Sequence, residues 1–122
     1  MSKQIILSID DSKAVHAFIQ ACLPSYEMIH AMDGKQGLQI LETTNQQISL
    51  VLLDWEMPGM IGPEVLKVIK QRKPDLPVIM LTSKNEPEDI KMVLGFGAAE
   101  YVLKPFTSEI LNEKIQSVLE VQ

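Results

Sequence analysis

Short apolar runs alternate with amphipathic segments along the chain. Four runs read as buried strands, Ile5–Ile9, Leu50–Leu53, Val78–Leu81 and Tyr101–Leu103, and Met28–Ala31, second in chain order, is a further strand that is short and weak. Strands that alternate with helical patterns are typical of βαβ units and a parallel sheet. The pattern therefore predicts an α/β fold with five strands.

The intervening segments carry the spacing of helices with one buried face. Val15, Phe18, Ile19 and Cys22 fall at positions i, i+3, i+4 and i+7, which predicts one inward helix face. A second helix is predicted after the capping box 33–36, with Gly37, Ile40 and Leu41 inward, and a third begins at Pro63, with Val65, Leu66 and Ile69 inward. A fourth opens at residues 85–88 and ends at Gly95 and Gly97. The last begins near Thr107 and buries Leu111, Ile115, Val118 and Leu119.

Polar side chains stand where the predicted strands end. Asp10 and Asp11 follow the first run, Asp54 follows the third, Thr82 the fourth and Lys104 the fifth. In open α/β sheets, ligands bind outside the carboxyl ends of the strands. A buried carboxylate is costly unless it is paired or bound to a metal. The sequence therefore predicts a compact, oxygen-rich site at this edge.

The charges of these residues indicate a divalent cation. Three carboxylates and the ammonium of Lys104 leave two negative charges. Mg²⁺ suits such a site because it prefers oxygen ligands and needs few carboxylates, and Mn²⁺ is the alternative. Without the metal, repulsion between the carboxylates should raise at least one pKa. A carboxylate in this setting can attack a phosphoryl group and form an acyl phosphate.

Composition excludes several other classes of protein. The chain has 122 residues, which suits one domain over residues 1–122, and a net charge of −5 without a Lys/Arg cluster, so we expect no binding of nucleic acid. The single cysteine, Cys22, indicates a core residue in a reducing compartment. We expect no signal peptide, no membrane span and a cytoplasmic location. His16 and His30 have no metal-ligand spacing, so we expect surface or structural roles for both.

Taken together, Asp10-Asp11, Asp54, Thr82 and Lys104-Pro105 resemble the receiver domains of bacterial two-component response regulators. The segments 54–62 and 97–106 fit that family at each position compared, and the resemblance covers essentially the whole chain. It implies a flavodoxin-like (βα)5 fold, a doubly wound five-stranded parallel sheet in the order 2-1-3-4-5.

The resemblance also implies roles for the polar residues of the site. Asp54 would be the phosphoacceptor, Asp11 a direct metal ligand and Asp10 a ligand acting largely through water. The backbone carbonyl of Glu56 would be a further metal ligand. Lys104 would pair with one phosphoryl oxygen, and its bond to Pro105 would be cis.

Three other residues have candidate roles in signalling. By resemblance, Thr82 would bind a phosphoryl oxygen and form a conformational switch with Tyr101. The alternative for Tyr101 is that it is a core aromatic without a signalling role. Glu56 lies two residues after Asp54, and Lys84 lies two residues after Thr82. We therefore expect the two to form an ion pair at the mouth of the site that modulates the lifetime of the phosphoryl group. The alternative is two exposed charges without effect.

These expectations describe a stand-alone, CheY-like response regulator that acts as a signalling switch rather than as an enzyme. A sensor histidine kinase or a histidine phosphotransfer protein would supply the phosphoryl group. The output would be relay of that group, or binding of a target protein through the helix near Pro87, the strand of Tyr101 and the last helix.

Three alternatives remain open. A phosphatase of the haloacid dehalogenase type would use an Asp-x-Asp motif, whereas this chain has Asp54-Trp55-Glu56. A pseudo-receiver would act as a scaffold without phosphate, although the polar set is complete. A receiver segment of a larger regulator is the third, and Met1 and Gln122 favour the stand-alone form.

Overall fold

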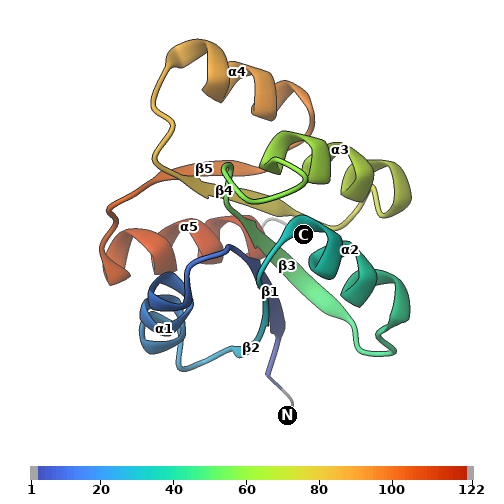
Figure 1. Ribbon diagram of the computed structural model, residues 1–122. Helices are drawn as coiled ribbons and strands as arrows, with labels where there is room; N and C mark the ends of the chain where they lie inside the picture. Colours follow the sequence, from blue (N-terminus) through green and yellow to red (C-terminus); the bar gives the residue numbers. More distant parts are fainter. Residues whose placement is uncertain (1–2, 121–122) are drawn as a thin grey trace.

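A computed structural model describes residues 3–120 of the chain (Figure 1). Its five strands are β1 (Ile5–Ile9), β2 (Glu27–Ala31), β3 (Ile48–Leu53), β4 (Val78–Thr82) and β5 (Glu100–Leu103). They form one parallel sheet in the order β2-β1-β3-β4-β5, so the predicted flavodoxin-like fold is confirmed.

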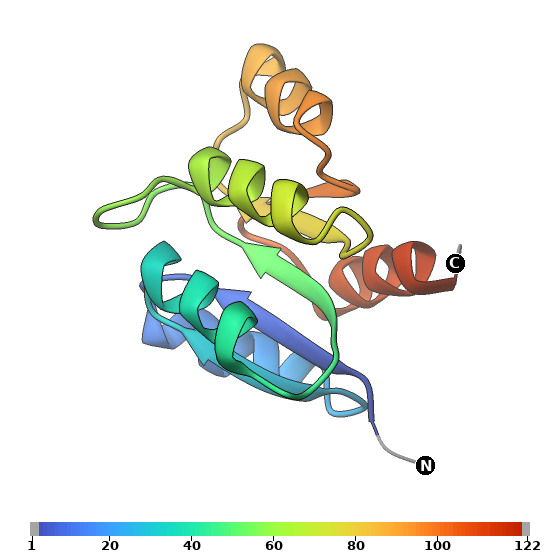
Figure 2. The same ribbon diagram turned by 90° about the vertical axis from the view of Figure 1, so that its right-hand side faces the viewer.

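Five described helices cover the two faces of the sheet. They are α1 (Lys13–Cys22), α2 (Gly34–Thr43), α3 (Gly62–Arg72), α4 (Pro87–Gly95) and α5 (Ser108–Glu120). Helices α1 and α5 lie on one face, and α2, α3 and α4 lie on the other (Figures 1 and 2). Within residues 3–120, no helix combines the length and the apolarity that crossing a membrane requires.

The two cores follow from the alternation of side chains along each strand. On β3, Leu50 and Leu52 pack with the core under α1 and α5, whereas Val51 and Leu53 pack with the core under the other helices. Because successive side chains point to opposite faces, a strand covered on both sides is apolar throughout. This explains the unbroken apolar runs in the sequence.

The first helix differs from the prediction at one position. Ile19 and Cys22 are buried, but Phe18 is 47% exposed and its ring centroid lies 5.4 Å from that of Phe106. His16 is buried in α1 instead. The spacing of apolar residues predicts which side of a helix is buried, but not how wide the buried surface is. Phe18 lies just outside the surface of α1 that contacts the sheet.

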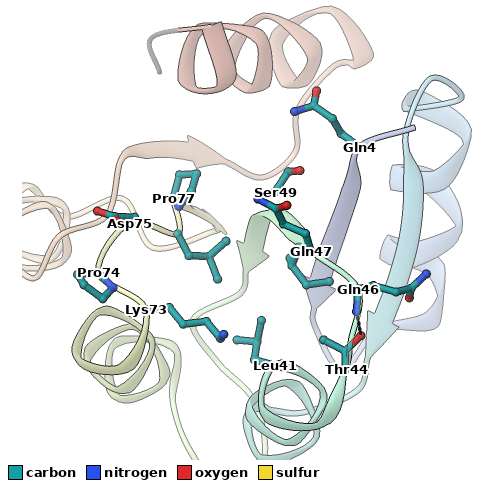
Figure 3. Close-up of a pocket in the computed structure, with 12 residues that line it drawn as sticks. Gln4, Leu41, Thr44, Gln46, Gln47, Ser49, Lys73, Pro74, Asp75 and Pro77 are labelled. Atoms are coloured by element: carbon teal, nitrogen blue, oxygen red, sulfur yellow. Dashed lines mark hydrogen bonds between the residues drawn. The ribbon is translucent and has the colours of Figure 1, made fainter. Parts of the chain in front are cut away.

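A groove of about 500 Å³ lies at the amino-terminal edge of the sheet, away from the strand ends that carry the acids (Figure 3). It runs between the segments that precede β3 and β4, and its lining includes Gln4, Gln46, Gln47, Lys73 and Asp75. It contains none of the predicted site residues, which gather at the opposite edge.

Candidate functional site

The adjacent strands β1 and β3 bring the three predicted carboxylates together. Each of Asp10, Asp11 and Asp54 offers an oxygen, and these oxygens all lie within 4.8 Å of one another. Asp10 and Asp54 are buried, with 2% and 9% exposure, whereas Asp11 is exposed. The backbone N–H of Asp54 donates to the carbonyl of Ile9 at 3.0 Å, which continues the pairing of the two strands up to the site.

Lys104 reaches this cluster from the end of β5. Its Nζ lies 2.7 Å from Oδ2 of Asp10 and 3.4 Å from Oδ1 of Asp54. Its backbone N–H donates to the carbonyl of Thr82 at 2.9 Å, which ties it to β4. The Lys104-Pro105 bond is cis, as predicted. Lys104 therefore supplies the positive charge of the site, and its shorter contact is with Asp10.

The pKa of Asp54 is raised above its ordinary value. Burial is the main cause, and the nearby Asp10 charge adds to it. The charge of Lys104 and the Trp55 N–H, which donates to Asp54 Oδ1 at 2.8 Å, act in the opposite direction without cancelling the effect. The prediction that one carboxylate has a raised pKa is confirmed, but burial is a larger cause than the predicted repulsion between carboxylates.

The residues of the cluster fit a divalent cation. Three carboxylate oxygens within 4.8 Å of one another, one of them on an exposed residue, provide the hard oxygen donors that Mg²⁺ prefers. The raised pKa of Asp54 indicates that a further positive charge would be favourable here. Asp10, Asp11 and Asp54 are the residues that would hold the ion.

The predicted ion pair at the mouth of the site is present. Lys84 Nζ lies 3.5 Å from Oε1 of Glu56, and it also lies 5.9 Å from the centroid of the Trp55 ring. The side chains of Lys84 and Glu56 are 39% and 74% exposed, so the pair itself contributes little to stability. It connects the loop after β3 with the loop after β4.

Thr82 and Tyr101 are linked through the backbone of Lys84. The N–H of Lys84 donates to Thr82 Oγ1 at 3.2 Å, and the hydroxyl of Tyr101 donates to the carbonyl of Lys84 at 2.5 Å. Burial, with a smaller effect from Asp89, raises the pKa of Tyr101 to about 12, so its hydroxyl keeps its proton. Thr82 and Tyr101 therefore contact the same residue, one at its N–H and the other at its carbonyl.

The loop after β3 is held close to the backbone of Asp54. The N–H of Gly62 donates to the carbonyl of Trp55 at 2.7 Å. A Cβ at Gly62 would lie 2.2 Å from the carbonyl oxygen of Asp54 and 2.9 Å from Cα of Trp55. This close approach requires glycine at position 62.

Two features of the site were not predicted from the sequence. The backbone N–H of Ser12 donates to Asp10 Oδ1 at 2.9 Å, and His16 Nε2 lies 2.7 Å from the carbonyl oxygen of Asp10. The available signal for His16 is its position three residues before Ile19, which places both on the inner side of α1.

Comparisons with known proteins agree with this geometry. The pattern of the response regulator receiver domain family matches residues 6–116. A chemotaxis protein CheY homolog of Campylobacter jejuni is 30% identical over 118 residues, which cover 93% of this chain and 91% of that protein. An alkaline phosphatase synthesis transcriptional regulatory protein of Bacillus subtilis, PhoP, is 34% identical, but the match covers 98% of this chain and 49% of that protein.

Solved structures give the same result. A CheY-like receiver domain protein of Methanospirillum hungatei has a TM-score of 0.91 at 31% identity, with 98% of this chain and 96% of that chain covered. Chemotaxis protein CheY4 of Vibrio cholerae has a TM-score of 0.89 at 28% identity, with 97% of this chain and 100% of that one covered. With the family pattern matched over residues 6–116 and the fold in common, this chain belongs to the response regulator receiver domain family of two-component signalling.

Proposed function

We propose that the chain is a stand-alone, single-domain response regulator that accepts a phosphoryl group on Asp54. The observation that carries this proposal is the Asp54 carboxylate itself. It is largely buried at the end of β3, shares a cluster with Asp10 and Asp11, and lies 3.4 Å from the ammonium of Lys104. The family supports the receipt of a phosphoryl group in general, and this geometry supports Asp54 as the acceptor.

In the proposed reaction, one oxygen of Asp54 attacks the phosphorus of a phosphohistidine. The new O–P bond forms as the P–N bond breaks, and the imidazole nitrogen leaves with the electron pair. The product is an acyl phosphate. Lys104 pairs with one phosphoryl oxygen and Thr82 donates its hydroxyl hydrogen to another, so that both stabilise charge at the transferred group.

Asp10, Asp11, Asp54 and the backbone carbonyl of Glu56 are the proposed ligands of Mg²⁺, with Mn²⁺ as the alternative ion. When bound, the ion neutralises charge on the phosphoryl oxygens. We assign Asp10 an indirect part, through water, and its two carboxylate oxygens already accept hydrogen bonds from the Ser12 N–H and from Lys104. Asp11, which is exposed, is free to contact the ion directly.

The proposed phosphoryl donor is a sensor histidine kinase or a histidine phosphotransfer protein in the cytoplasm. Such a partner must contact the rim of the site to bring its histidine to Asp54. A mostly apolar hollow of about 490 Å³ adjoins Lys104 and is lined by Val15, Phe18, Pro105 and Phe106 among others. An apolar rim that includes the exposed Phe18 and the half-buried Phe106 favours binding of a protein partner.

The proposed output surface is the face formed by α4, β5 and α5. A second hollow of about 490 Å³ lies there, and its lining includes the exposed Leu94, Leu103 and Ile110 together with Tyr101. Tyr101 is linked through Lys84 to Thr82, so this face is physically connected to the phosphorylation site. A target protein would read the phosphorylated state here.

The test is incubation with acetyl phosphate and Mg²⁺, followed by intact-mass measurement. Wild type should gain one phosphoryl group, whereas Asp54→Asn and EDTA-treated wild type should gain none. Robust labelling of Asp54→Asn would show that another residue is the acceptor. No labelling of wild type by acetyl phosphate or by a phosphohistidine donor favours the pseudo-receiver, and steady turnover of small phosphate esters favours the phosphatase.

A further inference from the structure

The buried histidine of α1 contacts two backbone carbonyls at the edge of the sheet. His16 is 5% exposed, and its Nε2 lies 2.7 Å from the oxygen of Asp10 and 3.2 Å from the oxygen of Ala31. Carbonyl oxygens only accept hydrogen bonds, so Nε2 carries a hydrogen and donates. His16 therefore bridges the residue that follows β1 and the last residue of β2.

The bond to Asp10 acts on both acids of the pair. The carbonyl of Asp10 belongs to the peptide group that joins Asp10 to Asp11. Because a peptide group is planar, fixing its oxygen fixes the direction in which the chain enters Asp11. The N–H of Asp10 is held as well, since it donates to the oxygen of Ala31 at 3.1 Å. His16 thus restrains the backbone from which two of the three carboxylates project.

We propose that His16 is a positioning residue for the divalent-cation site, and that it acts by orienting the Asp10-Asp11 peptide. The inference rests on the proposed function, which assigns Asp10 and Asp11 to that cation. An apolar side chain of similar size would fill the same space in the core. It would lack the N–H donor, so the carbonyl of Asp10 would lose this partner and the peptide would be less restrained.

The neighbouring His30 provides a natural comparison. Its ring centroid lies 4.5 Å from that of His16, and its Nε2 lies 3.2 Å from Gln20 Oε1. No hydrogen bond of His30 to Asp10 occurs among the described residues. Replacing His30 removes an imidazole from the same cluster while the contact between His16 and Asp10 is left in place.

In the experiment, the protein is titrated with Mg²⁺ alone, and binding is monitored through the fluorescence of Trp55. This residue is the single tryptophan of the sequence, it is buried, and its backbone N–H donates to Asp54. The variants are His16→Leu, His16→Gln and His16→Asn, with His30→Phe and Ile19→Val as controls. Ile19→Val tests for simple loss of core packing, because Ile19 is fully buried on the same helix.

We expect His16→Leu to raise the Mg²⁺ dissociation constant at least fivefold. His16→Gln carries an N–H at the distance of Nε2 and should stay within twofold of wild type, whereas His16→Asn, which places its amide nearer Nδ1, should resemble the leucine variant. The Mg²⁺ dissociation constants of both controls should stay within twofold of the wild-type value, whatever the melting temperatures of these variants. A His16→Leu affinity within twofold of wild type overturns the inference.

Two further results keep the test decisive. If His16→Leu fails to fold, the glutamine and asparagine variants decide, and equal affinities for these two overturn the inference. In metal-free wild type, imidazole ¹⁵N shifts should show the Nε2–H tautomer for His16, and an Nδ1–H tautomer overturns it. If wild type shows no saturable Mg²⁺ binding, the proposed function fails together with the inference about His16. If wild type binds Mg²⁺ and His16→Leu binds it equally well, only the inference about His16 fails.

Discussion

At the scale of single residues, Asp54 occupies an unfavourable place for a negative charge. Burial and Asp10 raise its pKa above the unfolded value of 3.8, so the folded state holds this proton more tightly than the unfolded state. The associated stability is present below the unfolded pKa and is lost as the pH rises through the folded pKa. At neutral pH, an ionised Asp54 therefore destabilises the fold.

Asp54→Asn should accordingly be more stable than wild type at neutral pH. We expect its melting temperature in EDTA to be higher by a few degrees at about pH 7.5, with a difference that shrinks toward about pH 3. Thermal unfolding of both proteins across this range measures the effect. Asp75→Asn, at an exposed acid, is the control and should show no such trend. A variant less stable than wild type at neutral pH contradicts the argument.

Glu56 and Lys84 are expected to set the lifetime of the acyl phosphate, because their ion pair spans the mouth of the site. Glu56→Ala and Lys84→Ala should each lose phosphate roughly three- to tenfold faster, since a barrier change of about 1.4 kcal/mol is tenfold in rate. Decay of the labelled protein, followed by intact mass, measures this. Glu42→Ala breaks the exposed pair with Arg72 away from the site and serves as the control. Decay of all variants within twofold of wild type would rule out a role in timing.

At the scale of elements, the connection from β3 to α3 determines how the chain leaves the phosphoacceptor. Gly62→Ala would place a Cβ against the backbone of Asp54 and Trp55, which cannot move aside as a flexible side chain would. We expect a loss of roughly 1–3 kcal/mol in the free energy of unfolding and slower phosphorylation of Asp54. Urea unfolding and intact-mass labelling measure the two effects.

Gly95→Ala is the matched control for this prediction. Gly95 ends α4, does not have a positive φ, and has no atom within 4 Å of the place that a Cβ would take. The added Cβ should raise stability by roughly 0.4–1 kcal/mol, because alanine restricts the unfolded chain. If both variants change stability equally, the close approach at Gly62 is not the cause.

The loop between β4 and α4 is the element expected to transmit phosphorylation. Thr82→Ala removes the hydroxyl that accepts from Lys84 but leaves the carboxylates and Lys104 in place. It should still accept phosphate on Asp54 and should lose most of the change around Tyr101, because a hydrogen bond to a charged group contributes roughly 1.5–3 kcal/mol. Amide chemical shifts with and without beryllofluoride measure this coupling. If beryllofluoride causes the same shift changes near Tyr101 in Thr82→Ala as in wild type, Tyr101 is only a core aromatic.

At the scale of the whole molecule, cation binding and folding should be coupled, because the acid cluster requires two strands to be side by side. Mg²⁺ at about 100 times its dissociation constant should stabilise the fold by roughly 2.7 kcal/mol. For a domain of this size, that raises the melting temperature by roughly 10 °C. Thermal unfolding with Mg²⁺ and with EDTA measures the difference. Asp11→Asn should lose most of it, and an equal rise in that variant would place the ion elsewhere.

Most of the fold could be predicted from the sequence because its signals are local. An unbroken apolar run such as Val78–Leu81 reflects burial on both faces of a parallel sheet, and the polar residues after four of the five runs mark the carboxyl edge. The ion pair of Glu56 and Lys84 was also predictable, since equal offsets from two neighbouring strand ends place both at one rim. The strand order came from the family resemblance, because pattern alone does not determine which strands are neighbours.

What only the tertiary structure decided is which groups pair across elements. The sequence by itself indicated that Lys104 belongs to the acid site, but not that its shorter contact is with Asp10. It indicated an inward face on the first helix, but not that His16 rather than Phe18 is buried there. Hydrogen bonds such as those of His16 to Asp10 and of Tyr101 to Lys84 join residues through packing of separate elements. Periodicity along one helix or strand specifies a direction, whereas such a bond requires the position of a second element, which packing of the whole chain sets.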